Sequence, residues 1–137
     1  MKRIIAFDVG DRRIGVAVSD PLGITAQGLE TYTRSDDVQK DADYLLSIAR
    51  RYKEPVKLLF GMPRNMDGSY GFQAEKVKEF AGVVLEKWDG EYAFWDERLT
   101  TVAAERALDE AELDWREKRK VVDKVAAVMI LQSYLGN

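Results

Sequence analysis

Residues 4–19 read I-I-A-F-D-V-G-D-R-R-I-G-V-A-V-S, and this stretch decides the fold. Ile4–Val9 is a short apolar run, while Arg13–Ser19 carries its larger apolar side chains at every second position. Both patterns predict strands, and Gly10-Asp11 between them predicts a tight turn. Pro21 and Gly23 then interrupt the chain before a weaker strand pattern at residues 26–32, which would complete an antiparallel meander of three strands.

The period changes after this meander, and helices alternate with short strands. Apolar residues at helical spacing predict a helix from Asp36 to Ala49, with Ser35 or Asp36 as its cap. The later elements are expected as a strand 56–61, a helix 74–88, a strand 92–95, a helix 101–112 and a helix 121–135. Leu113–Lys120 has no clear period and is expected to be a mobile loop, whose basic run either grips substrate or is only a solvated face.

This order predicts an α/β fold, a mixed five-stranded sheet with an antiparallel three-strand start followed by parallel strands, flanked by helices. With 137 residues and 46% hydrophobic composition, residues 1–137 are expected to form one domain. The N-terminus meets Asp8 before any apolar segment of signal or membrane-spanning length accumulates. We therefore expect a soluble, cytoplasmic protein without a membrane partner.

The composition restricts the chemistry. The chain has no cysteine and no histidine, which excludes disulfides, thiolate metal sites and imidazole general bases. Catalysis would have to use carboxylates, hydroxyls, amines or bound hard cations. The net charge of −3 argues against a general binder of polyanions, because such binding depends on clustered Lys and Arg. Any contact with nucleic acid must therefore be local and assisted by metal.

Four acidic residues lie at the ends of apolar elements. Asp8 ends the first run, where a strand interior would normally place Val or Ile, although an acid that bonds the following turn is an alternative. Asp96 and Glu97 follow a later strand, either as a metal-binding pair or as a cap for the next helix, and we favour Glu97 as the ligand for its longer side chain. Asp123 falls in the first turn of the last helix, where the helix dipole alone would favour an acid.

The combination gives these acids their weight. Mg²⁺ and Mn²⁺ prefer oxygen ligands, and such ions support phosphodiester hydrolysis without histidine. Asp8, one of the two acids at 96 and 97, and Asp123 are therefore expected to converge on a common cation. Lys124, next to Asp123, either neutralises phosphate or is simply solvated.

Four motifs resemble one known family. They are D-V-G-D-R-R-I-G-V-A-V-S-D at 8–20, G-M-P-R-N-M-D-G at 61–68, D-E-R-L-T-T at 96–101 and D-K-V-A-A-V-M-I-L-Q-S-Y-L at 123–135. In this order they resemble the YqgF family, also called RuvX, whose members are proposed Holliday junction resolvases. The resemblance implies a ribonuclease H-like fold and a metal-dependent nuclease. It also implies a role in maturing the precursor of 16S rRNA or in cleaving branched DNA.

The resemblance assigns roles by position. It implies catalytic roles for Asp8, Asp96, Glu97 and Asp123, of which Asp8, Glu97 and Asp123 would hold Mg²⁺ or Mn²⁺. Arg64 and Asn65 lie in the signature loop, where they either contact phosphate or belong to a loop that only fixes the backbone. Arg98 either binds substrate or pairs with a neighbouring acid. The basic residues expected around the cleft are Arg12, Arg13, Arg64, Arg116, Lys118, Arg119 and Lys120.

Two other functions remain as alternatives. One is an RNA-binding or ribosome-assembly factor with the same fold, which would not need convergent acids. The other is a phosphotransferase of the actin-like ATPase type, for which the chain is too short and lacks a second phosphate-binding hairpin. Structured RNA, branched DNA or a pre-ribosomal particle are the expected partners. The sequence leaves open which of these is the substrate, whether one or two metals bind, and whether the protein forms a homodimer.

Overall fold

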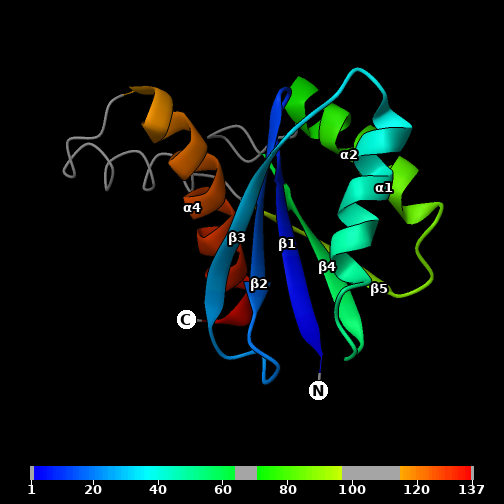
Figure 1. Ribbon diagram of the computed structural model, residues 1–137, viewed down its shortest axis with the longest axis vertical. Helices are drawn as coiled ribbons and strands as arrows, with labels where there is room; N and C mark the ends of the chain where they lie inside the picture. The colour runs from blue at the N-terminus through cyan, green and yellow to red at the C-terminus, as the bar shows by residue number, and fades with distance from the viewer. Residues whose placement is uncertain (1, 64–70, 97–114, 137) are drawn as a thin grey trace.

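A five-stranded mixed sheet forms the centre of the protein (Figure 1). The computed structural model describes residues 2–63, 71–96 and 115–136, and in the last range it describes side chains from Lys124 onward. The strands are β1 Arg3–Val9, β2 Arg13–Ser19, β3 Ala26–Thr33, β4 Val56–Met62 and β5 Glu91–Asp96, in the order β3-β2-β1-β4-β5. β1, β2 and β3 pair antiparallel, whereas β1, β4 and β5 pair parallel. The predicted sheet is confirmed.

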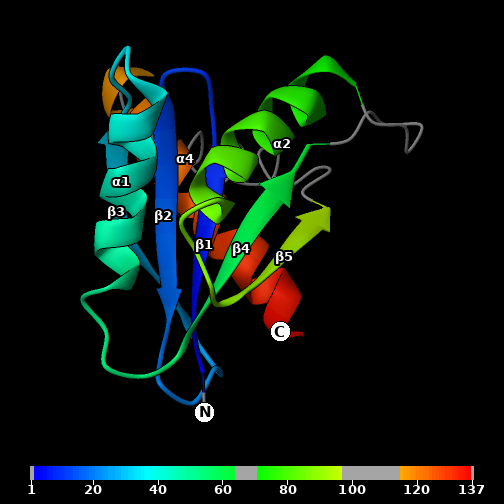
Figure 2. The same cartoon turned by 90° about the vertical axis from the view of Figure 1, so that its right-hand side faces the viewer.

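Helices cover both faces of this sheet (Figure 2). α1 Val38–Ala49 and α2 Phe72–Leu85 lie on one face, and α4 Trp115–Leu135 lies on the other. The helix expected at 101–112 lies outside the described residues. Within the described part of the chain, no helix is long and apolar enough to cross a membrane.

The start of α4 corrects one expectation. Residues 115–120 were expected to belong to a mobile loop, but the helix already begins at Trp115. The segment W-R-E-K-R-K lacks an apolar stripe, yet Arg, Glu and Lys are good helix formers and continue a helix that is anchored further along the chain. The missing apolar period was therefore no evidence against a helix at these residues.

The cap of α1 also differs from the expectation. Asp37 caps this helix, accepting hydrogen bonds from the backbone N–H groups of Gln39 at 2.9 Å and Lys40 at 3.3 Å. Ser35 instead donates its hydroxyl to Asp41 Oδ1 at 2.9 Å. The cap is therefore neither Ser35 nor Asp36, the two expected residues, and the Ser35 hydroxyl bonds a residue inside the helix.

The two faces of the sheet carry separate cores because strand side chains alternate. Ile5 and Phe7 of β1 pack with α1 and α2. Ile4 and Ala6 of the same strand pack with Ala127, Ile130 and Leu131 of α4. β1, the central strand of the five, is therefore buried on both faces and hydrogen-bonded on both edges.

Asp41 is a fully buried acid under the α1 and α2 face. Its Oδ1 accepts hydrogen bonds from the Tyr32 hydroxyl at 2.8 Å and from the Ser35 backbone N–H at 2.9 Å. Its Oδ2 lies 3.5 Å from Arg34 Nε, which suits an ion pair better than a hydrogen bond. Burial alone would raise the pKa of Asp41, but these bonds and the arginine outweigh it and hold the pKa below the ordinary 3.8.

Asp41→Asn should destabilise the protein at neutral pH by about 1.5–3 kcal/mol, because hydrogen bonds to a buried charge are lost. A carboxyl whose pKa is lowered by folding stabilises the native state above its ordinary pKa, and this contribution disappears as the pH falls through the lower native value. The difference between wild type and variant should therefore shrink below about pH 4. Urea unfolding at several pH values measures it.

Asp43→Asn is the matched control for this test. Asp43 lies in the same helix but is exposed, and it pairs with Lys87 at 2.8 Å. Such a surface pair contributes little to stability. Equal stability of wild type and Asp41→Asn at neutral pH would contradict the assigned role of Asp41.

Candidate metal and nucleic-acid site

Asp8 lies near the end of β1, directly opposite the buried Gly15 of β2. Ala6 points into the core under α4, whereas Val9 packs against the clusters on the α1 and α2 side. Strand alternation therefore places the partly buried side chain of Asp8 on the α4 face. Because glycine has no side chain, β2 places no side chain directly beside this carboxylate.

Asp96 ends β5, which lies two strands from β1 in the sheet. β1, β4 and β5 are parallel, so their carboxyl ends meet at one edge, with β1 and β5 roughly 10 Å apart. Asp96 is in register with Met62, which packs against Ala74 and Val77 of α2. Asp96 therefore lies on the α2 face, opposite the face that Asp8 occupies. Glu97, the next residue, lies outside the described residues.

Asp123 belongs to α4, which packs across the same sheet face as Asp8. It precedes the buried residues Ala126, Ala127 and Ile130 by three, four and seven positions, a spacing that puts all four positions on one side of the helix. Figure 1 places the first turns of α4 toward the end of the sheet at which β1 ends. The side chain of Asp123 itself lies outside what the structure describes.

The helix approaches the sheet closely through Lys124 and Gly28. A Cβ atom on Gly28 of β3 would lie 2.8 Å from Lys124 Cγ and 3.0 Å from its Cδ. The aliphatic stem of Lys124 therefore lies over the bare backbone of β3. Neither of the two roles expected for Lys124 includes this packing contact. The contact lets α4 lie close to β3 at the position next to Asp123.

A tight turn follows Asp8 and carries two of the predicted substrate residues. The Gly10 backbone N–H donates to Arg13 O at 2.9 Å, and a Cβ on Gly10 would lie 2.8 Å from the same oxygen. Only glycine fits this position without a shift of the backbone. This turn places both arginines beside the end of β1, where Arg12 is exposed and Arg13 is partly buried.

The remaining predicted site residues are not described. Arg64, Asn65, Glu97 and Arg98 fall in undescribed segments, as do the side chains of Arg116, Lys118, Arg119 and Lys120. Among the side chains that are described, no three carboxylates gather into a metal site. Asp8 nevertheless suits a hard cation, because it is a partly buried carboxylate at a constrained strand end. The convergence of Asp8, Glu97 and Asp123 stays a prediction.

Comparison with known proteins identifies the family. A family model described as "RuvX: Holliday junction resolvase" matches residues 2–137. The chain belongs to the RuvX family. The resemblance seen in the four motifs is thereby confirmed.

Close relatives of this RuvX chain extend over nearly its whole length. A protein of Clostridium tetani (strain Massachusetts / E88) named "Putative pre-16S rRNA nuclease" is 49% identical over 135 residues, which are 98% of this chain and 96% of the relative. A protein of the same name from Desulforamulus reducens is 51% identical over 135 residues, covering 98% and 97%.

Two solved structures share the fold at low identity. T. thermophilus RuvC in complex with a Holliday junction substrate matches with a TM-score of 0.56 at 16% identity, covering 99% of this chain and 97% of RuvC. The Fowlpox virus resolvase in complex with its Holliday junction DNA matches with a TM-score of 0.55 at 12% identity, covering 98% and 97%. This likeness concerns the fold alone, and it confirms the expected ribonuclease H-like architecture.

Asp8→Asn should leave the metal-free protein at least as stable as the wild type, because carboxylates gathered without a cation repel one another. The same change should remove most of the thermal stabilisation by Mg²⁺ or Mn²⁺, which for the wild type would be about 2.7 kcal/mol at a hundredfold excess over Kd. Melting curves with and without metal measure both effects.

Asp20→Asn serves as the control, because Asp20 also follows a strand of this sheet but at the opposite edge. Its Oδ1 accepts hydrogen bonds from the backbone N–H groups of Ile24 at 2.7 Å and Thr25 at 3.3 Å. This variant should keep the metal response of the wild type. If Asp8→Asn melts lower and responds to metal as the wild type does, Asp8 is a structural turn residue and no ligand.

Proposed function

We propose that this protein is a metal-dependent endonuclease that cuts structured nucleic acid in the cytoplasm, with the precursor of 16S rRNA as its substrate. The observation that carries the proposal is the place of Asp8, near the end of the central strand and on the sheet face that α4 covers. Membership of the RuvX family and two relatives of about 50% identity named as pre-16S rRNA nucleases support the same activity.

We propose Asp8, Glu97 and Asp123 as the residues that hold Mg²⁺ or Mn²⁺. Asp96 lies on the α2 face, away from Asp8, and Glu97 has the longer side chain of the two. This argument favours Glu97 over Asp96 as the ligand. Such a cation, when bound, stabilises the charge that develops during phosphodiester hydrolysis. The pairing of β1 with β2 fixes the backbone from which the Asp8 carboxylate would reach the cation.

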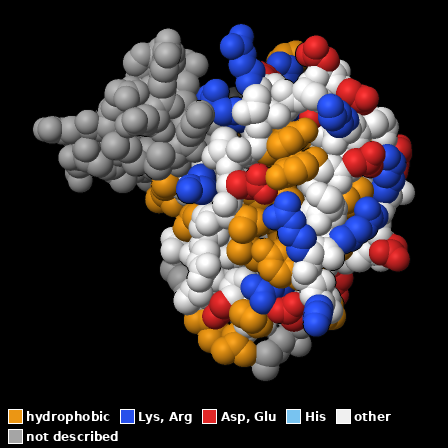
Figure 3. Space-filling model, viewed as in Figure 1, with side chains coloured by type: hydrophobic (Ala, Val, Ile, Leu, Met, Phe, Trp, Pro, Cys, Tyr) orange, Lys and Arg blue, Asp and Glu red, His pale blue; other side chains and the backbone are white. Residues whose placement is uncertain are grey.

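The charge distribution favours a structured RNA over bare duplex DNA. Figure 3 shows Lys and Arg side chains interspersed with Asp and Glu on the described face, without a continuous basic band. With a net charge of −3, non-specific attraction to a phosphate backbone is weak. Recognition then depends on shape and on a few basic residues, of which Arg12 is exposed beside the end of β1. A folded precursor or a pre-ribosomal particle presents one such site.

Labelled precursor 16S rRNA and a four-way DNA junction, each with Mg²⁺, Mn²⁺ or chelator, test this proposal. We expect metal-dependent cleavage of the RNA, abolished by chelator and reduced at least about 100-fold in Asp8→Asn, since loss of even an outer partner of a metal ligand costs 10- to 100-fold. Asp20→Asn should cleave like the wild type.

The other outcomes each decide against part of the proposal. Cleavage of the junction alone would make the protein a DNA resolvase and contradict the RNA substrate. Binding of the RNA without cleavage under any metal condition would identify a non-catalytic RNA-binding factor. Cleavage that persists in chelator would contradict metal dependence.

A further inference from the structure

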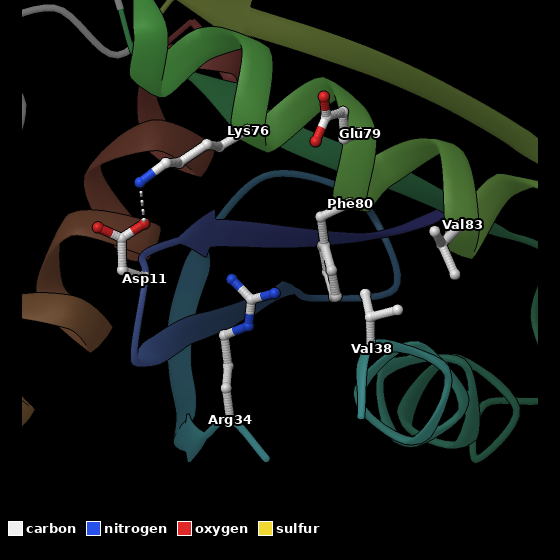
Figure 4. Close-up of a pocket in the computed structure, with 7 residues that line it drawn as sticks. All are labelled: Asp11, Arg34, Val38, Lys76, Glu79, Phe80 and Val83. Carbon is white, nitrogen blue, oxygen red and sulfur yellow. Dashed lines mark hydrogen bonds and ion pairs between the residues drawn. The ribbon is translucent and has the colours of Figure 1, made fainter. Parts of the chain in front are cut away.

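Arg34, the residue directly after β3, contacts three separate parts of the protein. Figure 4 shows its side chain among the residues that line a hollow between the turn, α1 and α2. Its Nη1 donates a hydrogen bond to the Gly10 carbonyl oxygen at 2.9 Å. Its Nε lies 3.5 Å from Asp41 Oδ2 in α1, and its guanidinium carbon lies 4.7 Å from the centre of the Phe80 ring in α2. The Arg34 side chain is only 21% exposed, so these contacts take up most of its surface.

The backbone of Arg34 holds the same turn a second time. The Arg34 backbone N–H donates to Arg12 O at 2.8 Å, while its side chain holds Gly10 O. Two carbonyl groups of the turn between β1 and β2 are therefore fixed by one residue. This turn begins two residues after Asp8, so its position bears directly on the end of β1.

The other end of this contact is rigid. Asp41 is fully buried and held by Tyr32 and Ser35, and Phe80 is 3% exposed. By contrast, the Lys76 contact to Asp11 at 3.3 Å joins two exposed side chains and adds little. Arg34 and Phe80 border a hollow of about 420 Å³ between the turn, α1 and α2, so substitution of Arg34 leaves space for the turn to move.

We infer that Arg34 is a positioning residue, which fixes the Asp8 end of β1 from the sheet face opposite the metal site. Metal ligands must be held within about 0.5 Å of their working geometry, and partners behind the ligands supply this precision. The expected effect of Arg34 on cleavage rests on the proposed function. The expected effect of Arg34 on the turn after β1 does not.

Arg3 is a matched control within the same chain. Its Nη1 donates to Ser19 O at 3.1 Å, its Nε donates to Glu54 Oε1 at 3.1 Å, and its guanidinium carbon lies 4.6 Å from the centre of the Tyr52 ring. Arg3 thus makes the same three kinds of contact with similar exposure of 16%, but at the start of β1. A merely structural role would make the two arginines equivalent.

Hydrogen exchange and cleavage kinetics of Arg34→Gln, Arg34→Lys and Arg3→Gln test the inference. Arg34→Gln should speed exchange of the amides in residues 8–13, whereas Arg3→Gln should not. In cleavage of precursor rRNA, Arg34→Gln should lower kcat about tenfold with little change in KM. Arg34→Lys, which folds with the charge beside Asp41 retained, should not restore kcat, since one ammonium group cannot serve both Asp41 and the Gly10 carbonyl.

Three results would overturn the inference. The first is unchanged exchange in residues 8–13 of both Arg34 variants. The second is an equal loss of kcat in Arg34→Gln and Arg3→Gln, which would indicate general destabilisation. The third is a raised KM in Arg34→Gln that returns to the wild-type value in Arg34→Lys, which would make Arg34 a phosphate contact. A wild type that cuts no substrate removes the proposed function, and the exchange result then still decides whether Arg34 holds the turn.

Discussion

β1 lies between β4, with which it pairs in parallel, and β2, with which it pairs antiparallel. These two pairings fix β1 on both edges, and the two cores fix it on both faces. A side chain near the end of such a strand has little freedom beyond its own rotamers. The position of Asp8 near the end of this strand is the reason why we propose it as a metal ligand.

The two faces of the sheet carry different polar residues. The α4 face carries Asp8 and the helix that contains Asp123, while the α1 and α2 face carries the buried Asp41, Arg34 and Phe80. The charged network on the second face is linked to the turn after β1 by hydrogen bonds. In this network Asp41 Oδ1 accepts hydrogen bonds from Tyr32 and Ser35, whereas Oδ2 has only the ion pair with Arg34. The proposed site would thus be supported by residues that no substrate needs to touch.

Short-range patterns in the sequence predicted the main elements. Alternation at residues 14, 16 and 18 predicted a strand, and helical spacing predicted α1. The two errors have different origins. Asp37 caps α1 while Ser35 donates to Asp41, a choice among neighbouring polar residues that apolar spacing does not resolve. α4 extends to Trp115 because the rest of that helix is anchored on the sheet, which is a long-range effect. Asp41 could have been noticed as an acid three residues after Val38 on an apolar helix face, whereas Arg34 carried no sequence signal. The roles of Glu97 and Asp123 stay predictions.

A crystal structure with bound Mn²⁺, located by its anomalous scattering, shows whether Asp8 is a metal ligand. A Mn²⁺ peak is expected on the α4 face of the sheet, with an Asp8 carboxylate oxygen at about 2.2 Å and a carboxylate from the start of α4 or from the residues after β5 completing the site. A Mn²⁺ ion bound elsewhere, with the Asp8 carboxylate bonded only to backbone N–H groups of its own turn, would contradict the role of Asp8 as a ligand.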